Sequence, residues 1–185
     1  MSNQTKKLIT ICALALSFSA NAQLKTTNGV IGYSVETPTS RADIPSHSGE
    51  NLEIKVRYLG PTDQKEYFAN GTYQEQVGIK LRSVNGCNVV YIMRRINPNP
   101  SISLSIKSNP GVTTVCGDKG YTMIKSILVP APKIGEEFTL AGSFNQNIVT
   151  IKLNNQELFT SEVPIVTKGD AGIRTDNAKI IFTYK

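Results

Sequence analysis

Apolar and polar residues alternate in short runs along most of this chain. Residues 51–59, 76–84, 101–107 and 178–184 carry apolar side chains at every second position, with charged or hydroxyl side chains between many of them. This period of two predicts β-strands with one buried and one solvated face. Residues 87–96 are apolar on both faces, which is typical of a central strand covered on each side.

Turn-forming residues divide the rest of the chain in the same way. Further β-rich runs are predicted at 121–129, 138–144, 148–153, 157–163 and 173–174. Residues 145–147 and 154–155 separate three of these runs and predict hairpin turns. Residues 25–50 contain Pro38 and Pro45 and are less regular, so we expect a lead-in strand and a long loop there.

The spacing of these runs predicts the fold class. No segment keeps a helical period over three turns, and about nine or ten short strands fit within one domain. Antiparallel strands in this number bury their apolar faces by packing two sheets together. We therefore predict an all-β protein, an antiparallel two-sheet sandwich, with a single domain over residues 23–185.

The N-terminal segment differs from this pattern. Two lysines precede an apolar run at residues 8–18, which is too short for a membrane span of about 20 residues. Ala20-Asn21-Ala22 then supplies the small-x-small pattern of a signal peptidase site. We expect a signal peptide at residues 1–22 and a secreted or periplasmic protein without a membrane anchor.

Charge narrows the range of partners. The full chain has 20 Lys and Arg against 14 Asp and Glu. Removing residues 1–22 takes away two lysines and no acidic residues, which leaves a formal net charge of +4. No run of Lys or Arg is longer than two residues. A nucleic-acid partner is therefore not expected.

Two cysteines remain after the predicted cleavage, Cys87 and Cys116. An even number of cysteines in an exported protein implies a disulfide. A metal pair or a catalytic thiol would need histidine partners, and the only histidine is His47, 40 positions from Cys87. We therefore favour a Cys87–Cys116 disulfide.

Three segments between Phe138 and Lys185 carry a resemblance to a known superfamily. They are a hairpin at residues 148–158 with Asn155 where glycine is usual, the motif GIRTDN at 172–177, and a last strand at 179–184. They resemble the end of a concanavalin-A-like lectin/glucanase (laminin-G-like) sandwich. The resemblance implies a jelly roll, a fold whose members include lectins, binding modules, glycoside hydrolases and polysaccharide lyases. Such members commonly hold glycans on a concave sheet or at its rim.

The GIRTDN motif also has a structural interpretation, which we favour over direct contact with a ligand. Gly169 and Gly172 would permit positive φ in a tight turn. Asp176 and Asn177 could bond backbone amides nearby, as Asx-turn residues do. Arg174 would pair with one of the neighbouring aspartates.

No catalytic pattern is complete. The E-x-D-x-x-E strand of the superfamily's retaining glucanases is absent from the sequence. Residues 67–74 (YFANGTYQ) resemble the Y-F-K-A-G-x-Y-x-Q strand of alginate lyases, but they lack its lysine and lie early in the chain. The R-x-E-L-R and Q-I-H motifs of those lyases are also missing. Among enzymes a lyase fits better than a hydrolase, and a non-catalytic protein fits better than either.

Metal binding has little support in the sequence. Asp118, Asp170 and Asp176 are isolated carboxylates in expected turns, without a spaced cluster of oxygen ligands. We expect no cofactor and no metal ligand, and calcium binding stays open.

Sugar binding uses aromatic faces beside planar or charged polar groups. The chain has no Trp, the commonest stacking residue, but it has 7 Tyr. Lys80, Arg82 and Arg94 on the polar faces of adjacent strands would form a cationic groove for an acidic glycan, and a solvated outer face is the alternative. The candidate ligand-binding residues are Lys80, Arg82, Tyr91, Arg94, Tyr67, Tyr73 and Tyr121.

The predicted function is thus non-catalytic glycan binding by an exported sandwich protein, with an acidic polysaccharide as a suitable ligand. Two alternatives stay open. One is a polysaccharide-active enzyme, and the other is a protein–protein interaction module such as an adhesin or an inhibitor.

The signal peptide yields the first testable prediction. Protein exported from a bacterial host should begin at Gln23, because signal peptidase cleaves after the small residue Ala22. N-terminal sequencing and the intact mass of the exported protein measure this. Exported protein that keeps residues 1–22 would contradict the prediction.

Overall fold

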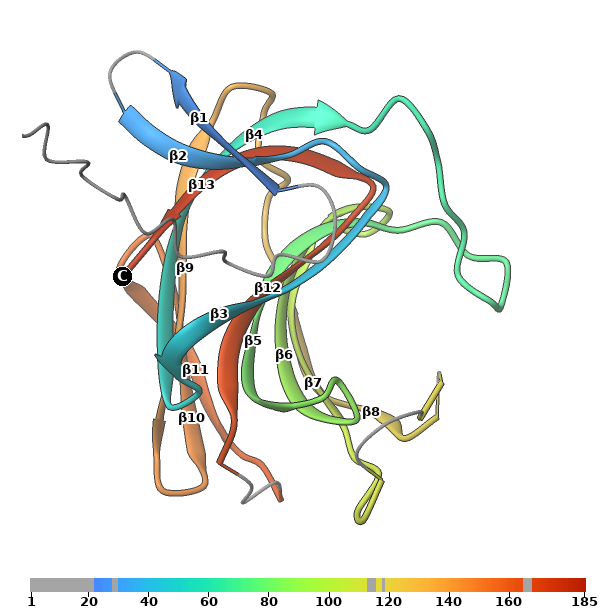
Figure 1. Cartoon of the computed structure of the whole chain (residues 1–185), viewed down its shortest axis with the longest axis vertical. Helices are drawn as coiled ribbons and strands as arrows, with labels where there is room; N and C mark the ends of the chain where they lie inside the picture. The colour runs from blue at the N-terminus through green and yellow to red at the C-terminus, as the bar shows by residue number, and fades with distance from the viewer. Residues whose placement is uncertain (1–21, 28–29, 113–115, 118, 165–167) are drawn as a thin grey trace, which may run out of the picture.

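The alternating pattern folds as antiparallel strands in two sheets that pack face to face (Figure 1). The structure is a computed structural model that describes residues 22–27, 30–112, 116–117, 119–164 and 168–185. It contains no helix in these ranges, and hence none that is long and apolar enough to cross a membrane. The predicted signal segment lies almost entirely outside the described residues.

Within the described residues, one sheet has seven strands and the other has six. The order in the seven-stranded sheet is β1 (Ala22–Thr27), β2 (Val30–Val35), β13 (Ala178–Tyr184), β4 (Asn51–Pro61), β9 (Glu137–Asn145), β10 (Ile148–Leu153) and β11 (Gln156–Glu162). The order in the six-stranded sheet is β3 (Thr39–Ser48), β12 (Asp170–Asp176), β5 (Glu75–Val84), β6 (Asn88–Asn97), β7 (Ser101–Lys107) and β8 (Tyr121–Leu128).

The predicted all-β sandwich is confirmed, and most predicted runs match strands closely. The expected long loop within residues 25–50 is wrong, because β2 and β3 occupy most of that segment. β3 is an edge strand that pairs with β12 alone. An edge strand tolerates a proline such as Pro45, since one side of its backbone needs no partner.

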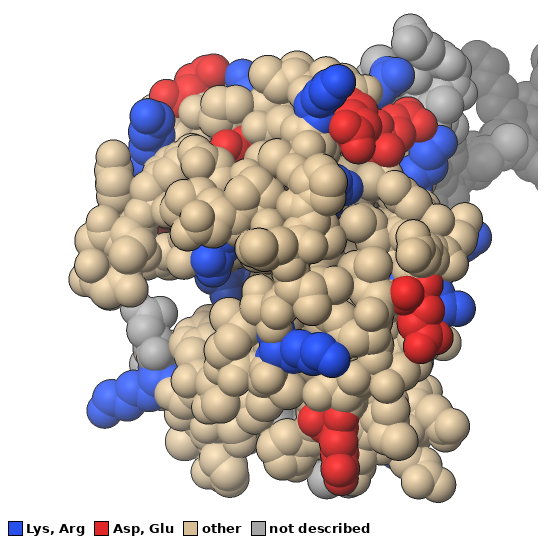
Figure 2. All heavy atoms as spheres, turned by 180° about the vertical axis from the view of Figure 1, so that it is seen from behind, with Lys and Arg blue, Asp and Glu red and all other residues tan. Residues whose placement is uncertain are grey.

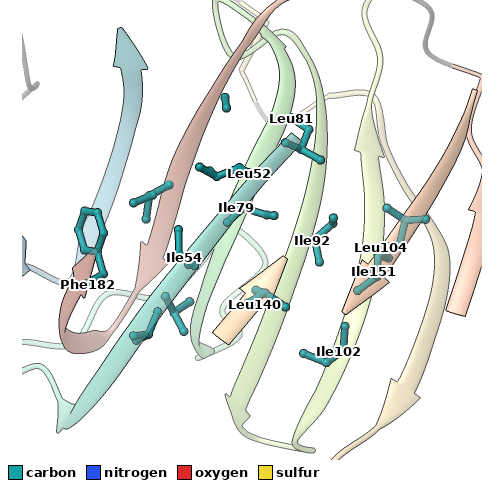
Figure 3. Close-up of a cluster of buried hydrophobic side chains, with 14 of the residues drawn as sticks. Leu52, Ile54, Ile79, Leu81, Ile92, Ile102, Leu104, Leu140, Ile151 and Phe182 are labelled. Carbon is teal, nitrogen blue, oxygen red and sulfur yellow. The ribbon is translucent and has the colours of Figure 1, made fainter. Parts of the chain in front are cut away.

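The core lies between the two sheets and consists of the apolar residues that the period of two selects. Leu52 and Ile54 on β4 and Leu140 on β9 face Ile79 on β5 and Ile92 on β6 (Figure 3). All five are 1% exposed or less. Burial of one such side chain stabilises the fold by about 1.5–3 kcal/mol, so this layer supplies the main driving force for packing the sheets.

The predicted disulfide is present and joins Cys87 to Cys116, with their Cα atoms 5.5 Å apart. Cys87 follows the Asn85-Gly86 turn between β5 and β6, where both turn residues have positive φ. Cys116 belongs to the segment between β7 and β8. The bond therefore connects two neighbouring loops at one end of the six-stranded sheet.

Replacement of both cysteines by serine should lower the free energy of unfolding by about 3.5 kcal/mol, because the unfolded chain regains the entropy of a loop of 29 residues. Urea denaturation of the exported wild type and of the Cys87→Ser/Cys116→Ser variant measures the change. Wild type treated with a reductant is the matched control and should unfold like the variant. Equal denaturation midpoints for oxidised and reduced protein would contradict the prediction.

Candidate functional site

A groove of about 680 Å³ lies on the outer face of the six-stranded sheet. Five of its strands, β3, β12, β5, β6 and β7, and the first residue of β8 contribute side chains to it. Residues 68–74, in the loop between β4 and β5, form one side, and the Asn85-Gly86 turn closes another part. Seen from behind, the surface has a hollow with basic side chains at its back (Figure 2).

Strand register builds the floor of the groove. Asp43, Gly172, Lys80 and Tyr91 lie directly opposite one another across β3, β12, β5 and β6. Lys80 Nζ donates a hydrogen bond to Asp43 Oδ1 at 2.6 Å, reaching across the intervening strand β12. A Cβ atom at residue 172 would lie 2.2 Å from the Ala42 carbonyl oxygen on β3 and 2.6 Å from Lys80 Cε, so glycine is required for the close approach of both.

The role of Gly172 corrects an expectation from the sequence. Gly172 was expected in a tight turn with positive φ, but it lies inside β12 and is not among the described glycines with positive φ. Its missing side chain, not its backbone freedom, is what the fold uses. Burial lowers the pKa of Lys80, and the hydrogen bond and charge of Asp43 partly offset that effect.

A second row of side chains centres on the buried carboxylate of Asp176, at the end of β12. Asp176 is 2% exposed and accepts hydrogen bonds from Arg41 Nη2 at 3.0 Å, Arg174 Nε at 2.9 Å and Gln76 Nε2 at 2.8 Å. The expected pairing of Arg174 with a neighbouring aspartate is confirmed. Arg41 and Arg174 are directly opposite on β3 and β12, so one carboxylate fixes two guanidinium groups in the groove.

Two tyrosines form the aromatic part of the groove. The rings of Tyr91 and Tyr121 stack with centroids 5.9 Å apart and an interplanar angle of 24°. Tyr91 is 2% exposed and lies under the Arg174 guanidinium, which is 4.9 Å from its ring centroid. Tyr121 is 42% exposed, and its hydroxyl is 3.4 Å from Arg174 Nη1. Burial and the nearby Tyr121 raise the pKa of Tyr91, so the Tyr91 hydroxyl stays neutral near pH 7.

The side formed by residues 68–74 depends on Asn177, the last residue of the GIRTDN motif. Its amide nitrogen donates to the carbonyl oxygens of Glu66 at 2.8 Å and Gln74 at 2.9 Å. Its side-chain oxygen accepts the Glu66 amide at 2.8 Å. Asn177 was expected to bond its own neighbourhood, but it bonds a loop more than 100 positions away. The GIRTDN motif therefore has a structural role, because Asn177 holds the loop that forms one side of the groove.

Within that loop Tyr67 and Tyr73 form an isolated antiparallel bridge, and their rings lie 5.9 Å apart. Tyr67 lines a smaller adjoining pocket of about 140 Å³. At the base of the loop, Tyr58 donates a short hydrogen bond to the buried carboxylate of Glu75. Burial raises the pKa of Glu75, and the bond from Tyr58 opposes this.

Of the seven candidate residues, Lys80, Tyr91 and Tyr121 line the groove. Tyr67 and Tyr73 lie in the loop beside it. The grouping of Lys80, Arg82 and Arg94 on one polar face is wrong, because only Lys80 faces the groove.

Arg82 leaves the alternation because the register of β5 and β6 shifts between Leu81 and Val84, and Arg82 has a φ of 49°. Its guanidinium binds Glu50 through two hydrogen bonds, at 2.6 and 3.1 Å, and donates to the Gln146 carbonyl at 2.7 Å. The same group lies 3.8 Å from the centroid of the Phe144 ring. Arg82 therefore connects β5 to the other sheet.

Arg94 lies on the core side of β6, directly opposite Val77. Its guanidinium is 3.9 Å from the centroid of the Phe138 ring and donates to the Pro130 carbonyl at 3.3 Å. Burial lowers its pKa, and Glu136 partly offsets this. Because residues 87–96 are apolar on both faces, the period of two does not assign Arg94 to either face, and only the pairing with β5 places it on the core side.

Several groove residues were not candidates from the sequence. They are Arg41, Phe68, Asn70, Gln76, Lys107 and Arg174. Arg174 and Lys107 carried a usable signal, since each is a charged residue on the polar face of an alternating strand. Arg41 carried none, because its segment was expected to be a loop.

Metal binding gains no support from the described residues, in which no three His, Cys, Asp or Glu side chains converge on one position. Asp118, one of the isolated carboxylates considered for calcium, lies outside the described residues.

Solved structures share this fold at low sequence identity. The carbohydrate-binding module CBM66 from Bacillus subtilis has a TM-score of 0.60 and 12% identity, with 88% of this chain and 89% of that chain covered. A GH16 protein from Bacteroides ovatus, in complex with a G4G4G3G product, has a TM-score of 0.57 and 9% identity, with 90% and 84% covered. A toad ovary galectin in complex with thio-digalactose has a TM-score of 0.52 and 12% identity, with 80% and 99% covered.

These likenesses show the class of fold, a concanavalin-A-like jelly-roll sandwich, and confirm the fold that the resemblance of residues 138–185 implied. No protein-family model matches the chain, and no curated protein matches its sequence. Because one fold carries many functions, the function has to be argued from the groove itself.

The position of Arg82 predicts a stability effect without a binding effect. Arg82→Met should lower the free energy of unfolding by about 1–3 kcal/mol, because the carboxylate of Glu50 and the Gln146 carbonyl lose their donor. Urea denaturation measures the loss, and the ligand affinity of the folded variant should equal that of wild type. Wild-type stability in this variant would contradict the role assigned to Arg82.

Proposed function

We propose that this protein is an exported, non-catalytic glycan-binding protein that holds an acidic polysaccharide in the groove. The observation that carries the proposal is the combination of an exposed tyrosine ring with an excess of positive charge in one hollow. Tyr121 offers an aromatic face at the edge of the groove, and aromatic faces cover the C–H patches of sugar rings.

Charge supports an acidic ligand. Arg41, Lys80, Lys107 and Arg174 line the groove, and Asp43 is the single carboxylate among its described lining residues. With Asp176 beneath the arginines, two positive charges remain in excess. A hollow of one sign attracts and concentrates ligands of the opposite sign.

Polar groups that can bond sugar hydroxyls surround these charges. Asn70, Gln74 and Gln76 contribute amide groups to the lining, and Asn85 contributes a fourth from the turn opposite. Such groups fix the orientation of a ligand whose rings contact the aromatic face. A carbohydrate-binding module, a galectin in complex with thio-digalactose and a GH16 protein in complex with a G4G4G3G product share the fold, which supports the same conclusion.

A second candidate function is β-elimination of an acidic polysaccharide. It is favoured by the Tyr121 hydroxyl, which lies 3.4 Å from Arg174 Nη1 in a cationic groove. A tyrosine beside a guanidinium could exchange a proton with the sugar ring while cations neutralise its carboxylate. Growth of ultraviolet absorbance from an unsaturated product would establish this function in place of simple binding.

Binding of residues 23–185 to arrays of acidic and neutral polysaccharides tests the proposal. Wild type should bind an acidic polymer class, and Tyr121→Ala should weaken the affinity about 10-fold because the exposed aromatic face is lost. Tyr184→Ala, on the other sheet, is the matched control and should bind like wild type. Titration calorimetry gives the affinities, and the absence of binding to every polymer would overturn the proposal.

A further inference from the structure

Lys107 differs from the other cations of the groove in what holds it. It is the last residue of β7, it is 6% exposed, and its ammonium donates a hydrogen bond to the Gly117 carbonyl at 2.6 Å. The ammonium also lies 5.2 Å from the centroid of the Tyr121 ring, directly across the strand pair. Among the described residues it forms no ion pair.

The remaining three cations are each compensated by a carboxylate. Asp43 neutralises Lys80, and Asp176 binds both Arg41 and Arg174. An ammonium has three donors, and for Lys107 one carbonyl oxygen and one ring face meet only part of that capacity. Burying a charge without a counter-charge is costly, and the described residues supply none to Lys107, so a negative group of a ligand would be favoured at this position.

The surroundings of Lys107 are held in place independently of any ligand. Gly117 follows Cys116, whose disulfide to Cys87 connects this loop to the Asn85-Gly86 turn. Asn109 adds bonds on both sides of the disulfide, donating to the Cys87 carbonyl at 3.0 Å and to the Lys119 carbonyl at 3.1 Å. The ammonium of Lys107 therefore extends from strand β7 to a carbonyl next to the disulfide, beside the exposed ring of Tyr121. A ligand does not have to order this position before it binds.

We propose that Lys107 is the specificity-determining residue of the groove and binds the anionic group of the glycan while Tyr121 covers the adjoining sugar ring. The inference rests on the proposed function and names the residue that distinguishes acidic from neutral ligands. An ammonium acts as a compact point charge, so Lys107 accepts a uronate carboxylate or a sulfate ester alike.

Two polymers that differ only in charge test the proposal, polygalacturonate and its methyl ester, with a sulfated galactan as a third probe. Wild type should bind the acid more tightly than the ester. Lys107→Met should reduce affinity for the acid about 10- to 100-fold, since a charge-assisted hydrogen bond is lost, and leave affinity for the ester unchanged. Lys107→Arg should restore most of the preference. Whichever acidic probe wild type prefers identifies the anionic group.

Lys125→Met is the matched control, because Lys125 lies on the edge strand β8 and contacts Phe159 outside the groove. It removes the same charge and should leave both affinities unchanged. Denaturation midpoints of all variants show that each one is folded.

The outcomes separate this inference from the function on which it rests. Wild type that binds none of the three polymers would overturn both. Wild type that binds the acid and the ester equally, or Lys107→Met that keeps the full preference for the acid, would overturn the role of Lys107 and leave groove binding intact. If Lys125→Met lost as much affinity for the acid as Lys107→Met, net charge alone would explain the effect, and the role of Lys107 would be overturned.

Discussion

The buried carboxylate of Asp176 is the interaction on which the groove depends. It receives hydrogen bonds from three strands, through Arg41 on β3, Arg174 on β12 and Gln76 on β5. A buried carboxylate is stable only when such donors satisfy it, and the guanidinium groups are in turn fixed in direction by its oxygens. Removing it would take away the acceptor that Arg41 and Arg174 share, so the directions of two guanidinium groups in the groove depend on one carboxylate. Asn177, the next residue, connects the same segment by hydrogen bonds to the loop on one side of the groove.

The opposite end of the groove is built by different means. A disulfide and hydrogen bonds of Asn109 connect its loops. This construction holds the ammonium of Lys107 beside a carbonyl and a ring, with no counter-charge among the described residues. The two ends of the groove therefore differ in the side chains that they offer to a ligand. Cations paired with carboxylates and amides occupy one end, and a cation without a carboxylate partner among the described residues lies beside an exposed tyrosine at the other.

Arginine side chains have two different structural roles in this sandwich. Arg174 lies in the groove, whereas Arg82 and Arg94 have their guanidinium groups over the faces of Phe144 and Phe138 and bond backbone carbonyls. A planar, weakly hydrated guanidinium suits such positions at the boundary of a core better than an ammonium does. A basic residue on a strand is therefore weak support for a ligand site until its face is known.

The sequence by itself determined the all-β class, most strand positions, the disulfide and the jelly-roll fold, because these follow from a local period of two, from cysteine number and from short motifs. It also indicated Lys80, Tyr91 and Tyr121 as candidate ligand-binding residues, each of which lies in a segment predicted as a strand. Only the tertiary structure decided which polar side chains meet. The groove brings together residues as far apart in the sequence as Arg41 and Arg174, and the register of the strands decides which of them lie side by side. A register shift after Leu81 turned Arg82 away, and a glycine at residue 172 gave Lys80 its place. Neither effect is local, because both depend on which strand lies alongside.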